Sequence, residues 1–109
     1  MIIRTLLATT LAAAAAPAFA GTFGLTYSQD IKPILDNNCV ECHHAGGRDP
    51  DLSQFPFQSK KLSGQQAIVQ KIVDVTGGTS PKMPPGQRDK LTSSQVNTVS
   101  QWLGEGLQP

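Results

Sequence analysis

The stretch Cys39-Val40-Glu41-Cys42-His43 places two thiols and one imidazole within five residues of the chain. It forms a C-x-x-C-H pattern in a sequence of 109 residues, which is long enough for one small domain. Only 6% of the residues are aromatic, so a core made of ordinary side chains alone would be thin. A group held by these five residues would therefore decide how the rest of the chain folds.

The N-terminal residues indicate where these thiols work. Residues 1–20 combine Arg4, an apolar core from Leu6 to Ala16 and the small-x-small end Ala18-Phe19-Ala20, which together are typical of a cleaved signal peptide. Their uncharged run is shorter than the roughly 20 residues that span a membrane. We therefore expect cleavage after Ala20, export to the periplasm, a single mature domain of residues 21–109, and no membrane insertion.

The mature chain is expected to be electrically neutral. Loss of Arg4 leaves eight basic residues against eight acidic ones, so electrostatics gives no reason to expect nucleic acid or an anionic membrane as partner. Export also places Cys39 and Cys42 in an oxidising compartment, where thiols are paired or otherwise consumed.

The segment before the motif is predicted to be a helix. Its apolar residues recur at helical spacing and share one face. They are Tyr27, Ile31, Ile34 and Leu35. Ser28 or Asp30 is expected to cap its start, and Pro33 is tolerated if it falls in the first turn.

Two further helices are predicted after the motif. Residues 65–75 carry an apolar face, begin at a capping box formed by Ser63 and Gln66, and end at Gly77-Gly78. The last helix begins at a second capping box, Thr92 with Gln95, and ends near Gly104. The apolar residues of these two faces are Ile68, Ile72, Val75, Val96, Val99, Trp102 and Leu103.

Two long segments, residues 45–61 and 76–90, show neither helical nor strand periodicity and are rich in Gly, Pro, Ser and Asp. Loops of this length are uncommon in a small domain unless they enclose something. The sequence therefore predicts an all-α fold of about three helices, with long loops around a bound group.

The C-x-x-C-H pattern is the attachment motif of a c-type haem. Two thiols at this spacing can add to two neighbouring vinyl groups of one porphyrin, and His43 then follows as the proximal iron ligand. A Cys39–Cys42 disulfide also suits the compartment, but no βαβ pattern supports a thioredoxin-like fold. A zinc site needs four tetrahedral ligands, which residues so nearly consecutive do not provide.

Met83 is the predicted second axial ligand. It is the only methionine of the mature chain and lies in the proline-stiffened loop Ser80-Pro81-Lys82-Met83-Pro84-Pro85-Gly86, outside any apolar helical face. Core packing is the alternative role for a methionine. A thioether opposite a histidine raises the reduction potential of the iron relative to stronger donors.

The mature chain resembles the class I c-type cytochromes, particularly their short single-haem periplasmic modules. The resemblance runs from Tyr27 to Gly104 and rests on five elements. These are Asp30-Ile31-Lys32-Pro33-Ile34-Leu35, Cys39-x-x-Cys42-His43, Met83-Pro84-Pro85, Leu91-Thr92 and Trp102-Leu103-x-x-Gly106. In that family the first and last helices cross beside the haem, which implies haem packing for Ile34, Leu35 and Trp102. The resemblance also implies that the Pro50 carbonyl accepts a hydrogen bond from the proximal His43.

A haem iron with both axial positions filled by the protein has no open site for a substrate, so we expect an electron carrier and not an enzyme. Its partners would be redox proteins that bind transiently, and a monomer is expected. Lys82, Arg88 and Lys90 flank Met83 and would form a docking patch at the haem edge, unless they are simply scattered solvated cations. The alternatives are a haem enzyme subunit or ligand sensor with a displaceable Met83, and a haemless disulfide module.

Overall fold

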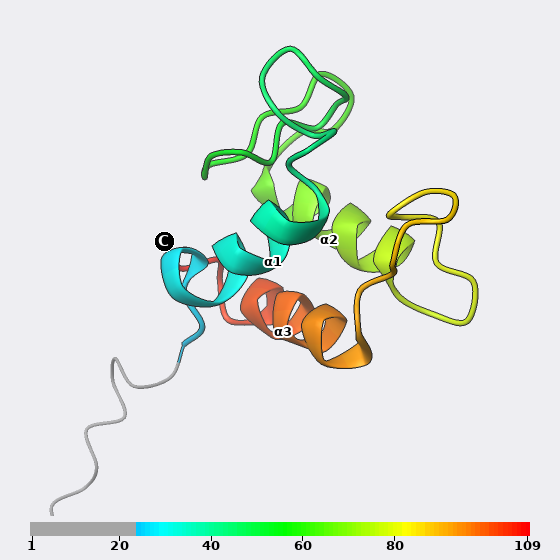
Figure 1. Cartoon of the computed structure of the whole chain (residues 1–109). Coiled ribbons are helices and arrows are strands. Elements are labelled where there is room, and N and C mark those ends of the chain that lie inside the picture. The colour runs from blue at the N-terminus through cyan, green and yellow to red at the C-terminus, as the bar shows by residue number, and fades with distance from the viewer. Residues whose placement is uncertain (1–23) are drawn as a thin grey trace, which may run out of the picture.

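The computed structural model describes residues 24–109, so the predicted signal peptide lies outside the described residues. Its elements are a short π-helix, η1 (Tyr27–Ile31), and three α-helices, α1 (Lys32–Asn38), α2 (Gln65–Thr76) and α3 (Ser93–Gly104). Within this range there is no strand, only an isolated antiparallel bridge between Asp51 and Gln58. Figure 1 shows one long loop between α1 and α2 and another between α2 and α3. The all-α prediction is therefore confirmed.

The start of the first helical segment differs from the prediction. Thr26, and not Ser28 or Asp30, is the N-cap, because its hydroxyl accepts a hydrogen bond from the Gln29 N–H at 3.2 Å. Asp30 takes the reciprocal position, since its carboxylate accepts the Thr26 N–H at 2.8 Å. The two bonds are reciprocal as in a capping box, but the acceptor Asp30 stands one residue later than the box requires.

The segment also begins as a π-turn, which was not predicted. The Lys32 N–H bonds to the Tyr27 carbonyl, five residues back, where an α-helix would use four. Pro33 lies in the first turn of α1 as expected and has no N–H to continue the earlier ladder. The chain therefore changes from the wider turn to the α-helix at this proline, and Ile31, Ile34 and Leu35 all remain buried.

One of the two predicted capping boxes forms. Thr92 and Gln95 exchange both hydrogen bonds at the start of α3, at 3.1 and 2.9 Å. At α2 the Ser63 box is wrong, because Gly64 is the N-cap and no side chain caps it. Gln65 instead bonds the backbone of Phe57, accepting from its N–H and donating to its carbonyl at 2.7 Å each. This pair attaches the start of α2 to the preceding loop.

The core lies where α2 and α3 pack together and where η1 meets α3. Its fully buried centre is Trp102, which lies beside three aromatic rings, those of Tyr27, Phe55 and Phe57, at centroid distances of 6.3, 5.3 and 6.2 Å. The indole N–H donates to the Gln108 carbonyl at 2.9 Å. The first and last helical segments therefore meet at Trp102, as the sequence led us to expect.

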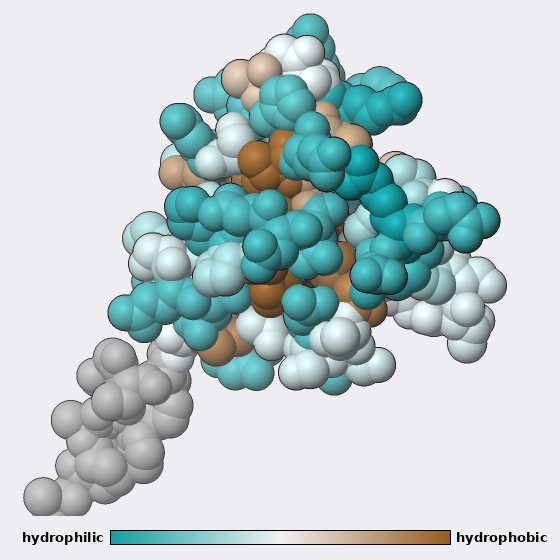
Figure 2. Space-filling view, viewed as in Figure 1, coloured by the Kyte–Doolittle hydropathy of each residue, from teal (hydrophilic) through white to brown (hydrophobic). Residues whose placement is uncertain are grey.

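The surface seen from the same side is mostly hydrophilic, with hydrophobic residues visible mainly in the gaps near its middle (Figure 2). Within residues 24–109, no helix is both long enough and apolar enough to cross a bilayer.

Candidate functional site

A cavity of about 430 Å³ lies between the C-x-x-C-H turn, the loop that follows it, α2 and the Met83 loop. Its size falls within the roughly 300–1,000 Å³ typical of ligand and cofactor sites. Cys39, Cys42, His43 and Met83, the four residues singled out by the sequence, all line it. The fold thus brings to one cavity residues that are up to 44 positions apart in the chain.

Local hydrogen bonds place the two thiols on the same wall. The chain continues past α1 in one tight turn, in which the Cys39 N–H donates to Leu35 at 2.8 Å and the His43 N–H donates to the Cys39 carbonyl at 2.9 Å. The Cys42 N–H also donates to the Cys39 carbonyl, at 3.2 Å. The two cysteines form no disulfide with each other, and both line the cavity.

The Cys39 thiol is partly buried, and the resulting loss of solvation raises its pKa to about 11. Desolvation disfavours the thiolate, so the thiol is neutral at physiological pH. Reactive cysteines in C-x-x-C redox motifs have the opposite property, a lowered pKa that exposes a nucleophilic thiolate. The environment of Cys39 therefore differs from that of a disulfide-exchange site.

The His43 ring is oriented by the loop that follows it. Its Nδ1 lies 3.0 Å from the carbonyl oxygen of Pro50, and because a carbonyl only accepts, Nδ1 carries the proton. The Leu52 N–H donates to the His43 carbonyl at 2.9 Å and fixes the backbone on the same loop. This arrangement leaves Nε2 with its lone pair available to a metal, which is how ligating histidines are commonly held.

Asp49 organises the loop that presents the Pro50 carbonyl. Its carboxylate accepts hydrogen bonds from the Ser59 hydroxyl at 2.7 Å and from the N–H groups of Lys60 and Lys61 at 2.6 and 3.4 Å. The hydrogen bond from Ser59 and those from the two backbone N–H groups hold the pKa of Asp49 below its ordinary value of 3.8.

We expect Asp49→Asn to lower the melting temperature of the holoprotein at neutral pH and to lose this effect in acid. A carboxylate with a lowered folded pKa stabilises the fold above its unfolded pKa, and this contribution is lost as the pH falls through the folded value. The gap between the wild type and Asp49→Asn should therefore narrow below about pH 3.8. Thermal unfolding followed from pH 7 to pH 2 measures it.

Asp89→Asn is the matched control, because it removes an exposed carboxylate that accepts no hydrogen bond from any described residue. It should leave the melting temperature near the wild-type value at pH 7. A gap for Asp49→Asn that stays constant down to pH 2 would contradict the assigned role of the Asp49 charge.

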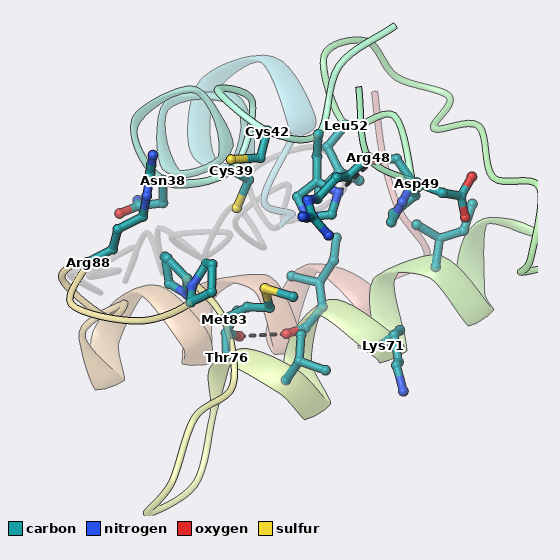
Figure 3. Close-up of a pocket in the computed structure, with 17 residues that line it drawn as sticks. Asn38, Cys39, Cys42, Arg48, Asp49, Leu52, Lys71, Thr76, Met83 and Arg88 are labelled. Atoms are coloured by element: carbon teal, nitrogen blue, oxygen red, sulfur yellow. Dashed lines mark hydrogen bonds between the residues drawn. The ribbon is translucent and has the colours of Figure 1, made fainter. Parts of the chain in front are cut away.

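Met83 is held by the end of α2. The N–H groups of Lys82 and Met83 both donate to the Val75 carbonyl, at 2.8 and 2.9 Å, and the following Pro84 is buried. Lys90 donates from its ammonium to the carbonyls of Pro84 and Gly86, which braces the loop internally. Figure 3 shows the Met83 sulfur on the opposite side of the cavity from the sulfurs of Cys39 and Cys42.

The residues expected to pack against a haem are not at the cavity wall. Ile34, Leu35 and Trp102 are buried in the core and are not among the residues that line the cavity. The physical reason is that they fill the space where the helical segments meet. At the end of α1 nearest the motif, Asn38 and Cys39 do line the cavity.

The predicted docking patch is altered by local contacts. Arg88 forms an ion pair with Glu41, and the ammonium of Lys90 is turned toward loop carbonyls. Among the three, only the Lys82 side chain is exposed without a hydrogen bond or ion pair to a described residue. Two of the three cations therefore have partners within the chain, and their role in docking stays a prediction.

The sequence missed the wall that α2 provides. Ile68, Ile72 and Val75 line the cavity together with Thr76, whose hydroxyl donates to the Ile72 carbonyl at 2.6 Å. The helical spacing of these residues predicts an apolar face, but it does not indicate what that face contacts.

Two exposed cations, Arg48 and Lys71, also line the cavity, and no sequence signal indicated them. Among the described residues, no three His, Cys, Asp or Glu side chains are placed so that they alone could hold a metal ion.

Comparison with known families agrees with this geometry. The cytochrome c family model matches residues 28–106, and the chain therefore belongs to the cytochrome c family. Searches of curated proteins and of solved structures gave no match. The chain is a class I c-type cytochrome with an all-α fold, and members of this family bind haem c covalently.

The residues present suit that cofactor. Cys39 and Cys42 supply two thiols on one turn for the two thioether bonds, and His43 offers a ring nitrogen to the iron. The remaining wall is mainly apolar, which suits a flat hydrophobic macrocycle. Haem c in this family serves electron transfer.

Proposed function

We propose that this protein carries single electrons in the periplasm through one covalently bound haem c, with His43 and Met83 as axial iron ligands. The observation that carries the proposal is the cavity itself. It brings the imidazole of His43 and the thioether of Met83, from loops 40 residues apart, to the cavity that both thiols line. These are the donor types that hold the iron of electron-transferring cytochromes at a raised potential.

The bound haem supplies a reversible one-electron change at the iron. The residues of this chain control where and how easily that change occurs. Pro50 accepts the His43 Nδ1–H and so makes the imidazole a better electron donor. The apolar side chains of α2 keep water away from one wall, and the polarity of such a wall influences the reduction potential.

Filled axial positions favour a carrier over an enzyme or sensor. A haem enzyme or gas sensor needs an iron position that is open or readily vacated. Here the Met83 backbone is bonded to α2, and its loop is braced by Lys90, so the thioether is held in place. A haemless disulfide module is disfavoured because the chain belongs to a family whose members bind haem c covalently. Its partners would be redox proteins that bind briefly over a small interface.

A spectrum and a redox titration of the holoprotein purified from the periplasm test the proposal. We expect haem to stay attached after denaturation, a far-red methionine–iron charge-transfer band in the oxidised form, and a titration that fits one electron. A wild-type protein that lacks the band and binds carbon monoxide rapidly when reduced would favour an enzyme or sensor. A denatured chain without haem would contradict every haem-based function.

A further inference from the structure

An ion pair joins the haem-attachment turn to the loop that carries Met83. Glu41 is the second variable residue of the C-x-x-C-H motif, and Arg88 lies five residues after Met83. The Arg88 guanidinium donates to both carboxylate oxygens of Glu41, at 2.8 and 3.1 Å, so the contact is bidentate. The two residues are 47 positions apart in the chain, and the pair therefore reflects the tertiary fold.

Within the described residues, this pair is the only polar contact between residues 39–48 and residues 82–90. The other bonds of the Met83 loop lead elsewhere. Lys82 and Met83 bond to Val75 at the end of α2, and Lys90 bonds to carbonyls within the loop itself. The loop is therefore attached to α2 at one end and to the haem-attachment turn through Arg88.

The ion pair of Arg88 with Glu41 connects the segments that carry His43 and Met83. Arg88 lines the cavity on the side away from Arg48 and Lys71 (Figure 3). His43 follows Glu41 by two residues, so the pair connects the segment of one axial residue to the loop of the other. Breaking it would leave the far end of the Met83 loop without a polar attachment to the turn.

We propose that Arg88, through its ion pair with Glu41, is a positioning residue that holds the Met83 loop closed over the haem pocket. The inference rests on the proposed function in one respect, that Met83 is the ligand whose loop is held. An arginine suits this role because its planar guanidinium binds a carboxylate with two parallel bonds, which fixes direction as well as distance.

The strength of the contact is limited by water. The side chains of Arg88 and Glu41 are 44% and 74% exposed, so salt screens their attraction. Exposed ion pairs change equilibria only modestly, and we expect loop opening to become about two- to fivefold more frequent when the pair is removed. The pair therefore adjusts how often the loop opens, and an opening that frees Met83 also breaks the bonds of the Lys82 and Met83 N–H groups to Val75.

The experiment compares four holoproteins with the wild type: Arg88→Gln, Glu41→Gln, the exchanged pair Glu41→Arg with Arg88→Glu, and Lys60→Gln. Lys60→Gln is the matched control, because it removes one exposed positive charge that is not paired with any described residue. One measurement is the rate at which carbon monoxide binds to the reduced protein in low salt and in about 1 M salt. The other is hydrogen exchange of the Lys82 and Met83 amides.

We expect both single variants of the pair to bind carbon monoxide about two- to fivefold faster in low salt and to exchange both amides faster by a similar factor. High salt should remove the difference, because it weakens the pair in the wild type. The exchanged pair should restore most of the wild-type behaviour, and Lys60→Gln should match the wild type. If the single variants acted only by disturbing packing, the exchanged pair would disturb it as well and would not restore the wild-type rates.

Wild-type rates of gas binding and amide exchange in Arg88→Gln would overturn the proposal. The amide measurement does not require that Met83 is an iron ligand, so it separates this proposal from the proposed function. If the wild type lacks the methionine–iron band but Arg88→Gln still exchanges faster, the loop contact stands and the axial assignment fails. If the band is present and the exchange is unchanged, the axial assignment stands and the loop contact fails.

Discussion

Replacing both Cys39 and Cys42 by alanine is expected to leave the chain largely unfolded. The cavity they line measures about 430 Å³. At about 24 cal/mol per Å³, an enclosed cavity of this volume corresponds to about 10 kcal/mol, which is an upper bound because this one opens to solvent. That figure is of the same order as the roughly 5–15 kcal/mol by which whole domains are stable. The upper bound on the cost of an empty cavity is therefore comparable to the whole net stability, which is why we expect the double variant to unfold.

The helices of this chain are short and depend on packing, which also favours unfolding of the double variant. The helix α1 has 7 residues, and α2 and α3 have 12 each, whereas isolated helices shorter than about 12–15 residues are marginal in water. Far-ultraviolet circular dichroism of the double variant should show most of the helical signal lost. Ala45→Ser, a small exposed change after the same motif, is the control and should keep its helix. A double variant that keeps most of the wild-type helix would contradict the prediction.

The second large effect is expected for Met83→Ala. Removing the thioether takes away the proposed second axial ligand, so the far-red methionine–iron band should disappear and carbon monoxide should bind rapidly to the reduced protein. The reduction potential should fall by on the order of 0.1 V or more, within the roughly 0.8 V over which axial ligands set haem potentials. Absorption spectra, gas-binding kinetics and a redox titration measure the three changes.

Met83→His separates ligation from packing. An imidazole is a stronger donor than a thioether, so this variant should also lose the band and have a lower potential. It should still bind carbon monoxide slowly, because the position on the iron remains filled. If Met83 only fills space, the wild type would already lack the band and both variants would keep the wild-type potential, and the axial assignment would be wrong.

Features of the fold and of the site that depend on one short segment could be predicted from the sequence. The capping box of Thr92 with Gln95 lies within four residues, and it forms as expected. The C-x-x-C-H motif is equally local, because its spacing alone brings two thiols to one turn. Met83 is predicted by a different argument, because it is the only methionine of the expected mature chain and lies in a proline-stiffened loop outside any apolar helical face.

The errors arise where local signals compete or where distant residues meet. Ser63 is a good capping residue, but the bonds of Gln65 to Phe57 fix the start of α2 at Gly64. The ion pair of Glu41 with Arg88 joins residues 47 positions apart, and neither residue has a neighbour that indicates the other. Contacts of this kind depend on how the loops fold back, which periodicity and capping patterns do not describe.

The few aromatic residues are also used differently from the expectation. A thin aromatic core suggested that a bound macrocycle would take its place, and the cavity is consistent with that. Phe55 and Phe57, however, lie in a loop without periodicity and still join Tyr27 and Trp102 in one cluster. The chain thus gathers four of its rings in one cluster, and none of these four lines the cavity.

The burial of Trp102 has a practical consequence for studying this protein. It is the only tryptophan of the sequence, and its side chain is fully buried in the core. Because there is one tryptophan, all indole emission comes from one known position. The intensity of that emission depends on exposure to water and falls when a haem lies nearby. The molecule therefore carries an intrinsic optical reporter at the junction of its first and last helical segments, and no added label is needed to follow that junction.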